Sequence, residues 1–97
     1  MLEKCERLVG NKASEWQVKN MRTKWGTCNI PKRRIWLNLQ LVKKPPESLE
    51  YVIIHELVHL LEKSHNDKFR KYMDQFYLNW RLVRTDLSEQ MLDYMEK

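Results

Sequence analysis

Residues 46–65, PESLEYVIIHELVHLLEKSH, decide how this chain folds. Proline is tolerated in the first turn of a helix, so Pro45 and Pro46 end the preceding segment and begin a helix. From there to residue 61, apolar side chains cover most of the helix circumference: Leu49, Val52, Ile53, Ile54, Leu57, Val58, Leu60 and Leu61. A helix that is apolar on nearly every side is buried. We therefore predict a central, largely buried helix over residues 49–61.

The same helix contains His55-Glu56-Leu57-Val58-His59, which is an HExxH sequence. Residues four apart lie on one helix face, so the two imidazoles can meet one Zn²⁺ at about 2.0–2.1 Å. Glu56 lies beside them, where it can reach a water on the metal. The alternative is that both histidines only form hydrogen bonds in the core. Burying two histidines and a glutamate without a cation is costly, so we predict that His55 and His59 bind zinc.

A catalytic zinc needs a third protein ligand and an open position. His65 is the remaining histidine, six residues beyond His59, and the HExxHxxGxxH class places its third histidine at this spacing. Glu62 replaces the glycine of that pattern, so we expect the helix to run about a turn further before it bends. Glu62 is the rival ligand because it shares a helix face with His55 and His59, but three ligands on one straight helix converge poorly. We predict His65; the alternative is a solvent-exposed histidine before an Asn66 helix cap.

These groups predict a zinc-dependent hydrolase. Zinc lowers the pKa of a bound water towards about 7 and polarises a carbonyl or phosphoryl group. Glu56 can take the proton of that water and return it to the leaving group, which makes it the predicted catalytic residue. Tyr72 and Tyr77 are weaker candidates for stabilising the oxyanion, because each also fits an apolar helix stripe.

The segments before the central helix are predicted to be mostly strands. Residues 1–9 are expected to form a short helix closed by Gly10. Apolar and polar side chains alternate over residues 15–24 and most cleanly over residues 35–41, with Ile35, Leu37, Leu39 and Leu41 on one face. We expect these two strands to pair in antiparallel fashion around a turn at residues 25–29.

The segments after the central helix are predicted to be helical. Asn66 is a favourable N-cap for a helix with the apolar stripe Phe69, Tyr72, Met73, Phe76 and Trp80. A last helix is expected over residues 80–96, carrying Leu87, Met91, Tyr94 and Met95, with a kink or restart at Thr85 or Asp86. The predicted fold class is therefore α+β: a short antiparallel sheet, an active-site helix and two further helices.

Composition limits the remaining possibilities. The 97 residues suit one domain spanning residues 1–97, which we expect to be a monomer. No apolar run approaches the ~20 residues of a membrane span, so no membrane partner is expected. Residues 1–5 lack a secretory signal, which favours the cytoplasm. The two cysteines are expected to be reduced thiols, with a metal or catalytic role for Cys28 as the minor alternative.

The net charge of +5 is unevenly distributed along the chain. Residues 1–49 hold eleven Lys and Arg against four Asp and Glu, whereas residues 50–97 hold seven against nine. The basic N-terminal half is a possible contact for a nucleotide, a nucleic acid or an acidic segment. The alternative is an ordinary solvated face.

Several segments, in one order, resemble the YgjP-like metallopeptidase domain, a group of small zinc hydrolases related to the SprT-like and WLM proteases. The similarity runs from about residue 15 to residue 85. Its segments are MRTKWGTC (21–28), IWLN (35–38), Pro45, YVIIHELVHL (51–60), His65-Asn66 and Phe69.

The resemblance implies a minimal zincin fold, with His55, His59 and His65 as zinc ligands and Glu56 as general base. By the same analogy, an extended polypeptide substrate would lie along a sheet edge near residues 35–39. Trp25 and Asn38 also match family positions, where they imply a structural role in holding the turn against the helix. Family members are usually longer, with strands N-terminal to residue 1. The chain is therefore either a minimal form or one trimmed at its N-terminus.

Three functions are compatible with these observations. A zinc metallopeptidase acting on extended polypeptide is the leading prediction. A metal-dependent pyrophosphatase acting on nucleotides is the first alternative, with the basic half supplying phosphate contacts. The second is a zinc-stabilised module that binds DNA or protein without efficient catalysis.

Overall fold

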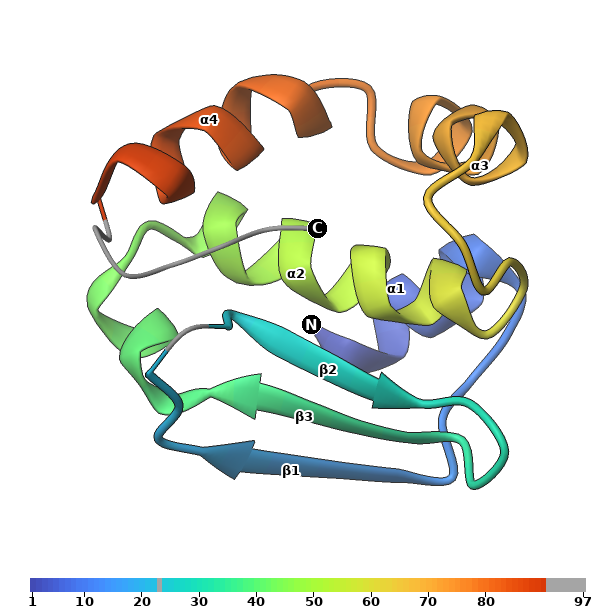
Figure 1. Ribbon diagram of the computed structural model, residues 1–97, viewed down its shortest axis with the longest axis horizontal. Helices are drawn as coiled ribbons and strands as arrows, with labels where there is room; N and C mark the ends of the chain where they lie inside the picture. The colour runs from blue at the N-terminus through green and yellow to red at the C-terminus, as the bar shows by residue number, and fades with distance from the viewer. Residues whose placement is uncertain (23, 91–97) are drawn as a thin grey trace.

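In the computed structural model, which describes residues 1–22 and 24–90, helix α2 (Pro46–His59) lies in the middle of the molecule (Figure 1). Every residue from Tyr51 to Val58 is buried, as expected for a helix that is apolar all round. The sheet covers one side of α2, whereas α3 and α4 cover the other (Figure 1). The predicted central helix is thus confirmed.

Helix α2 ends earlier than the sequence predicts. The expected extra turn beyond His59 does not form. The amide of Leu60 donates to the carbonyl of Leu57 at 3.0 Å, and the amides of Leu61 and Glu62 both donate to Val58 at 2.8 Å. These bonds tighten the last turn and satisfy carbonyls that would otherwise lack partners. The chain then turns without any residue in the left-handed region, which among the described residues is occupied only by Gly10 and Arg33.

The sheet contains β1 (Glu15–Lys19), β2 (Gly26–Asn29) and β3 (Arg34–Asn38), in the spatial order β1-β3-β2. Strand β1 is parallel to β3, and β2 is antiparallel to it. The predicted antiparallel pairing of residues 15–24 with 35–41 is therefore wrong, and the predicted turn at 25–29 is mostly strand β2. The chain leaves β1, crosses to the far edge of β3, and returns through a tight hairpin.

Buried Asn38 holds this crossing in place. Its Nδ2 donates to the carbonyls of Met21 at 2.9 Å and Lys24 at 2.7 Å, and its backbone amide donates to the carbonyl of Trp25 at 2.9 Å. Its Oδ1 accepts from the amide of Gln40 and starts the short 3₁₀ helix η1 (Leu39–Lys43). Strand β3 therefore stops at Asn38, and the predicted inward position of Leu39 is wrong: its side chain is 49% exposed.

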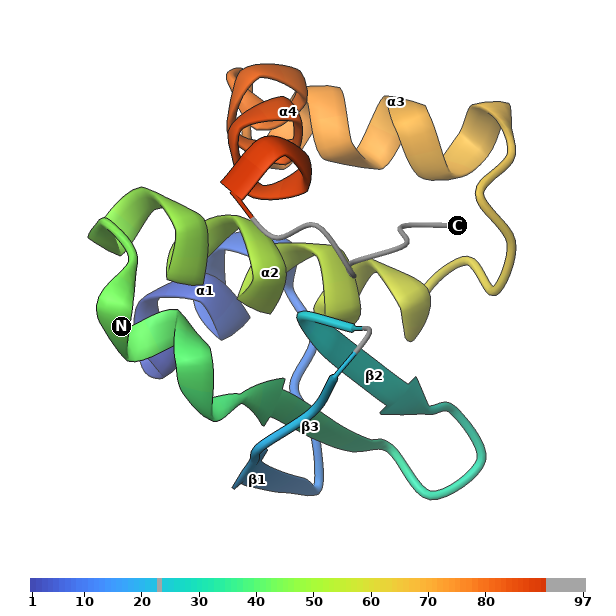
Figure 2. The same cartoon turned by 60° about the vertical axis from the view of Figure 1, so that its left-hand side comes forward.

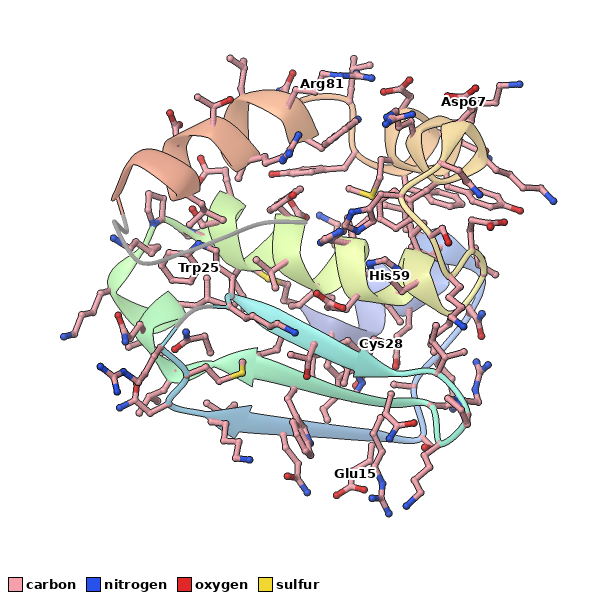
Figure 3. The ribbon with its side chains drawn as sticks, viewed as in Figure 1. Glu15, Trp25, Cys28, His59, Asp67 and Arg81 are labelled. Carbon is pink, nitrogen blue, oxygen red and sulfur yellow. The ribbon has the colours of Figure 1, made fainter. Side chains whose placement is uncertain are left out.

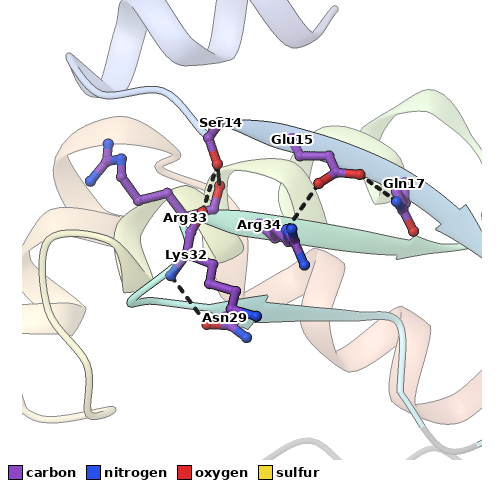
Figure 4. Close-up of polar contacts among 7 residues, drawn as sticks. All are labelled: Ser14, Glu15, Gln17, Asn29, Lys32, Arg33 and Arg34. Carbon is purple, nitrogen blue, oxygen red and sulfur yellow. Dashed lines mark hydrogen bonds and ion pairs between the residues drawn. The ribbon is translucent and has the colours of Figure 1, made fainter.

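The hairpin between β2 and β3 is fixed by polar contacts (Figure 4). Asn29 Oδ1 accepts from the amide of Lys32 at 3.2 Å, and Ser14 Oγ lies 2.6 Å from the Lys32 carbonyl oxygen. Arg33 adopts a left-handed conformation with φ of 54°. Arg34 forms an ion pair with Glu15 across β1 and β3 at 2.9 Å. Because β3 is paired on both sides, the expected substrate edge near residues 35–39 is wrong: the free edges of the described sheet are β1 and β2.

The remaining helices pack around α2 (Figure 2). Helix α1 (Leu2–Val9) ends at Gly10, whose φ of 78° supplies the left-handed cap that the sequence predicts. Helix α3 (Asp67–Phe76) begins at Asn66, whose side chain accepts from the amide of Phe69 at 3.0 Å. Both predicted helix boundaries are thereby confirmed.

Helix α4 (Trp80–Gln90) begins at residue 80, as the sequence predicts. Trp80 was also assigned to the apolar stripe of the preceding helix, but α3 ends at Phe76. Helix α4 is continuous through Thr85 and Asp86, so the predicted kink or restart is wrong. The predicted contributions of Met91, Tyr94 and Met95 lie outside the described residues. Among residues 1–22 and 24–90, no helix has the length and apolar character that crossing a membrane requires.

Candidate metal centre

Three imidazoles converge where α2 ends and α3 is about to begin. His55 and His59 come from successive turns of α2, and the turn after His59 brings His65 back towards them. The Nε2 atom of His65 lies 3.1 Å from Nε2 of His55 and 2.9 Å from Nε2 of His59. Two nitrogens that share a tetrahedral zinc at about 2.0–2.1 Å are about 3.3 Å apart, so the spacing suits a common cation.

The hydrogen bonds around these rings favour a cation over mutual hydrogen bonding. Nδ1 of His59 lies 3.0 Å from the carbonyl oxygen of Lys63, which can only accept, so Nδ1 carries the proton. Nε2 of His59 then has no proton, and its lone pair points towards the other two imidazoles. In a neutral imidazole, Nε2 carries either one proton or one lone pair. The Nε2 atom of His65 therefore cannot form good hydrogen bonds to the Nε2 atoms of both His55 and His59. A metal ion satisfies all three at once.

Electrostatics keep the three histidines in the neutral form that binds metal. Burial, followed by the proximity of His59 and His65, holds the pKa of His55 well below its usual value. Burial and His65 lower the pKa of His59 to about 4. Burial, then Arg84 and Arg70, also lower the pKa of His65. All three imidazoles are therefore neutral at pH 7.

The rings are also fixed by packing. Phe69, which is 3% exposed, lies with its ring centroid 5.1 Å from that of His55 and 4.7 Å from those of His59 and His65. Tyr51 stacks on the other side of His55 at 5.6 Å, with the two rings nearly parallel. The sequence identified Phe69 as part of an apolar stripe and as one of the residues that carry the family resemblance, but not as a neighbour of the histidines. The clue to its place at the site was its position three residues after the Asn66 cap, where its amide donates to the Asn66 side chain and its ring lies close to His65.

Glu62, the rival third ligand, takes a different role. Its carboxylate accepts a hydrogen bond from Nδ2 of Asn66 at 2.9 Å, so it ties the turn to the cap of α3. Among the described residues, the group of side chains spaced to hold a metal consists of His55, His59 and His65. The turn after His59 thus brings His65, and not Glu62, towards the other two histidines, and His65 stays the predicted third ligand.

Glu56 shares a cavity of about 460 Å³ with the three histidines. Strand β2 forms the opposite wall through Gly26, Thr27 and Cys28. Figure 3 shows His59 near the C-terminal end of α2, above Cys28 on β2. A buried carboxylate beside three convergent imidazoles, in an open cavity, can exchange a proton with a water or substrate placed there.

The cysteines do not join this group. Both Cys5 and Cys28 are free thiols, as predicted. Burial, followed by the negative charge of Glu56, raises the pKa of Cys28 to about 12, so its thiol stays protonated. Cys28 lines the cavity but is not part of the described group of side chains spaced to hold a metal, so the minor interpretation of Cys28 as a metal ligand finds no support.

The tyrosines proposed for the oxyanion lie elsewhere. The hydroxyl of Tyr77 donates to the carbonyl of Glu47 at 3.2 Å, at the opposite end of α2 from His59. Tyr72 stacks on Phe76. Neither lines the cavity that contains Glu56. Arg84 is exposed and lines a smaller cavity of about 160 Å³ together with His55 and His65.

This fold is that of very small metallopeptidases. The structure is similar to the metallopeptidase zymogen abylysin of Pyrococcus abyssi, with a TM-score of 0.85 and 16% identity, covering 98% of this chain and 95% of that one. It is also similar to the metallopeptidase zymogen jannalysin of Methanocaldococcus jannaschii, with a TM-score of 0.76 and 21% identity, covering 92% and 91%.

The chain belongs to the YgjP-like metallopeptidase domain family, whose model matches residues 1–90. The resemblance found in the sequence is thereby confirmed, as is the α+β fold class. Among curated proteins, none matches the sequence significantly.

Proposed function

We propose that this protein is a zinc-dependent peptidase in which His55, His59 and His65 hold the metal and Glu56 is the general base. The observation that carries the proposal is the convergence of three neutral imidazole nitrogens beside a buried carboxylate in one open cavity. Membership of a metallopeptidase family supports the same assignment.

Zinc bound there supplies a Lewis acid that polarises the scissile carbonyl and acidifies water. The backbone carbonyl of Lys63 orients the His59 ring, because its hydrogen bond to Nδ1 fixes the tautomer that leaves Nε2 unprotonated. Phe69 excludes water from the back of the three rings. Glu56 accepts the proton of the attacking water through its carboxylate oxygen and passes it to the leaving amine.

The substrate lies along β2 in this proposal. Within the described sheet β2 pairs only with β3, so its other edge offers free backbone donors and acceptors. That strand also forms the wall of the cavity opposite Glu56. An extended polypeptide added to this edge passes across the histidine cluster, and its backbone hydrogen bonds hold the scissile bond in place.

The proposal is tested with a quenched fluorescent peptide pool and purified zinc-loaded protein. We expect cleavage that a chelator abolishes and that added zinc restores. Glu56→Gln should retain one zinc per chain and lose nearly all turnover, because it keeps the shape of the side chain but cannot accept a proton.

Full turnover by Glu56→Gln would remove Glu56 from the mechanism. Release of pyrophosphate from nucleotides without peptide cleavage would replace the proposal by the nucleotide hydrolase alternative. Retention of zinc with neither activity, and a large fall in melting temperature on chelation, would indicate a zinc-stabilised binding module.

A further inference from the structure

Two lysines line the cavity beside the three histidines. Lys24 immediately precedes Trp25 and β2, and Lys63 lies in the turn between His59 and His65. Both side chains are exposed. They come from opposite halves of the chain and meet at one cleft only because of the fold.

These two lysines are free to interact with a substrate. Neither forms an ion pair with any residue in the ranges 1–22 and 24–87, whose side chains the structure describes. By contrast, Arg34, which lines an adjoining cavity of about 510 Å³, is already paired with Glu15 at 2.9 Å (Figure 4). Among the described residues, Glu56 is the one acidic side chain that lines either cavity. Apart from the catalytic carboxylate, the lining charge is therefore positive.

The lysines lie at opposite ends of the β2 edge. Lys24 is next to the start of β2 at Gly26, whereas Lys63 lines both cavities together with Ile30, which follows the end of β2. Along β2, Glu56 lies against Gly26, and His59 lies above Cys28 (Figure 3). A polypeptide extended along β2 therefore has one lysine near the residues before the scissile bond and the other near the residues after it.

We infer that the cleft selects polypeptide segments with acidic side chains on both sides of the scissile bond, an inference that rests on the proposed peptidase function. Carboxylates near Lys24 and Lys63 gain Coulomb attraction in a cleft whose walls limit screening by water. Basic side chains at the same positions are repelled. The same field attracts a nucleotide phosphate, so the test includes that competitor.

The test compares three quenched peptides of equal length that differ only in the residues flanking the scissile bond: Asp or Glu, Ala, or Lys on both sides. Turnover is measured with the zinc-loaded protein, and binding is measured by fluorescence anisotropy with the Glu56→Gln variant. We expect kcat/KM and affinity to fall in the order acidic, neutral, basic. The acidic and basic peptides should differ by about tenfold at low salt, with a smaller difference at high salt.

Variants that reverse the charge of each lysine test whether these side chains cause the preference for acidic peptides. Lys24→Glu and Lys63→Glu should each reduce kcat/KM for the acidic peptide about tenfold and raise it for the basic peptide. Lys71→Glu on α3 is the matched control, since it changes the net charge equally but lines neither cavity, and it should alter neither value. Zinc content, measured for each variant, separates these effects from loss of the metal.

Equal kcat/KM and equal affinity for acidic and basic peptides would overturn the inference while leaving the peptidase proposal intact. The inference would also be overturned if a nucleoside triphosphate bound to the Glu56→Gln variant and displaced the acidic peptide at lower concentration than the peptide's own Kd. If no peptide is cleaved but the acidic peptide alone binds, the peptidase proposal fails and the charge preference of the cleft stands.

Discussion

The backbone of Gly26 lies directly against the side chain of Glu56. A Cβ atom at position 26 would lie 3.1 Å from Oε2 and 3.2 Å from Cγ of Glu56, and 2.8 Å from Cγ1 of Val52. Glycine is needed here because there is no space for a Cβ atom. A special backbone conformation is not the reason, since the φ of Gly26 is not positive. Strand β2 can therefore approach α2 closely enough for the carboxylate to face the same cavity as the substrate edge.

We expect Gly26→Ala to lower kcat by about tenfold or more, because a small displacement of a catalytic group is costly. Zinc content should stay at the wild-type level. The control is Gly10→Ala, which has nothing within 4 Å but a φ of 78°. That variant should lose about 1 kcal/mol of stability with unchanged kcat. A Gly26→Ala protein with wild-type kcat would show that Glu56 tolerates the displacement.

The third ligand is tested by comparing His65→Ala with Glu62→Gln. Loss of an outer-shell partner alone weakens metal binding by about 10–100-fold, so removing a ligand should cost more than a hundredfold. We expect His65→Ala to lose zinc to a weak chelator and Glu62→Gln to retain it, as measured by elemental analysis after competition. The opposite result would assign the metal to Glu62.

Phe69 should support both stability and metal binding. Phe69→Ala removes the ring that contacts all three imidazoles, and it should cost about 3–5 kcal/mol in the free energy of unfolding. Phe69→Leu keeps most of the volume and should cost less than about 1.5 kcal/mol. Chemical denaturation with and without zinc separates the two effects. Equal zinc affinity in both variants and the wild type would limit Phe69 to packing.

The metal-free protein should lose stability as the pH falls from 7.5 to 5. The pKa of His59 is about 4 in the folded protein against an ordinary value of 6.5, and those of His55 and His65 are also lowered. Below about pH 6.5 the unfolded chain therefore binds protons that the folded chain does not, which favours unfolding. We expect the melting temperature to drop by about 5 °C or more.

The control for this pH dependence is His59→Gln, which removes the imidazole whose pKa is lowered to about 4 and leaves a helix-forming side chain in its place. Its melting temperature should vary less over the same range. Measurements stop at pH 5 because carboxylates begin to titrate below that value. A flat profile in the metal-free wild-type protein would contradict the lowered histidine pKa values.

The parts of the structure that follow from local patterns could be predicted. The periodicity of residues 49–61 predicted the buried central helix, although the structure ends it at His59. Gly10 and Asn66 predicted two helix boundaries, because capping depends on bonds to residues within one turn. The spacing of His55 and His59 placed them on one face, and this follows from helix geometry alone.

The sheet could not be predicted in the same way. The sequence alternation identified β3 and its pairing with residues 15–24, but it gave the wrong direction for that pairing and missed β2. Strand direction and order depend on contacts between residues far apart in the chain. Asn38 binds the carbonyls of Met21 and Lys24 across the end of the sheet, which lets the chain cross over β3 and leaves β1 parallel to it. That arrangement makes β2 the edge beside the cavity and leaves no free edge on β3.

By itself, the sequence determined the α+β class, the buried helix, and the chemical identity of the three imidazoles and the carboxylate. These depend on side-chain type and on spacings of a few residues. Only the tertiary structure decided that His65 rather than Glu62 approaches the pair on α2, and that Phe69 contacts all three rings. It also decided that Gly26 and two lysines line the same cavity as Glu56. The physical reason is that the close packing of distant segments sets these distances, and no local pattern records that packing.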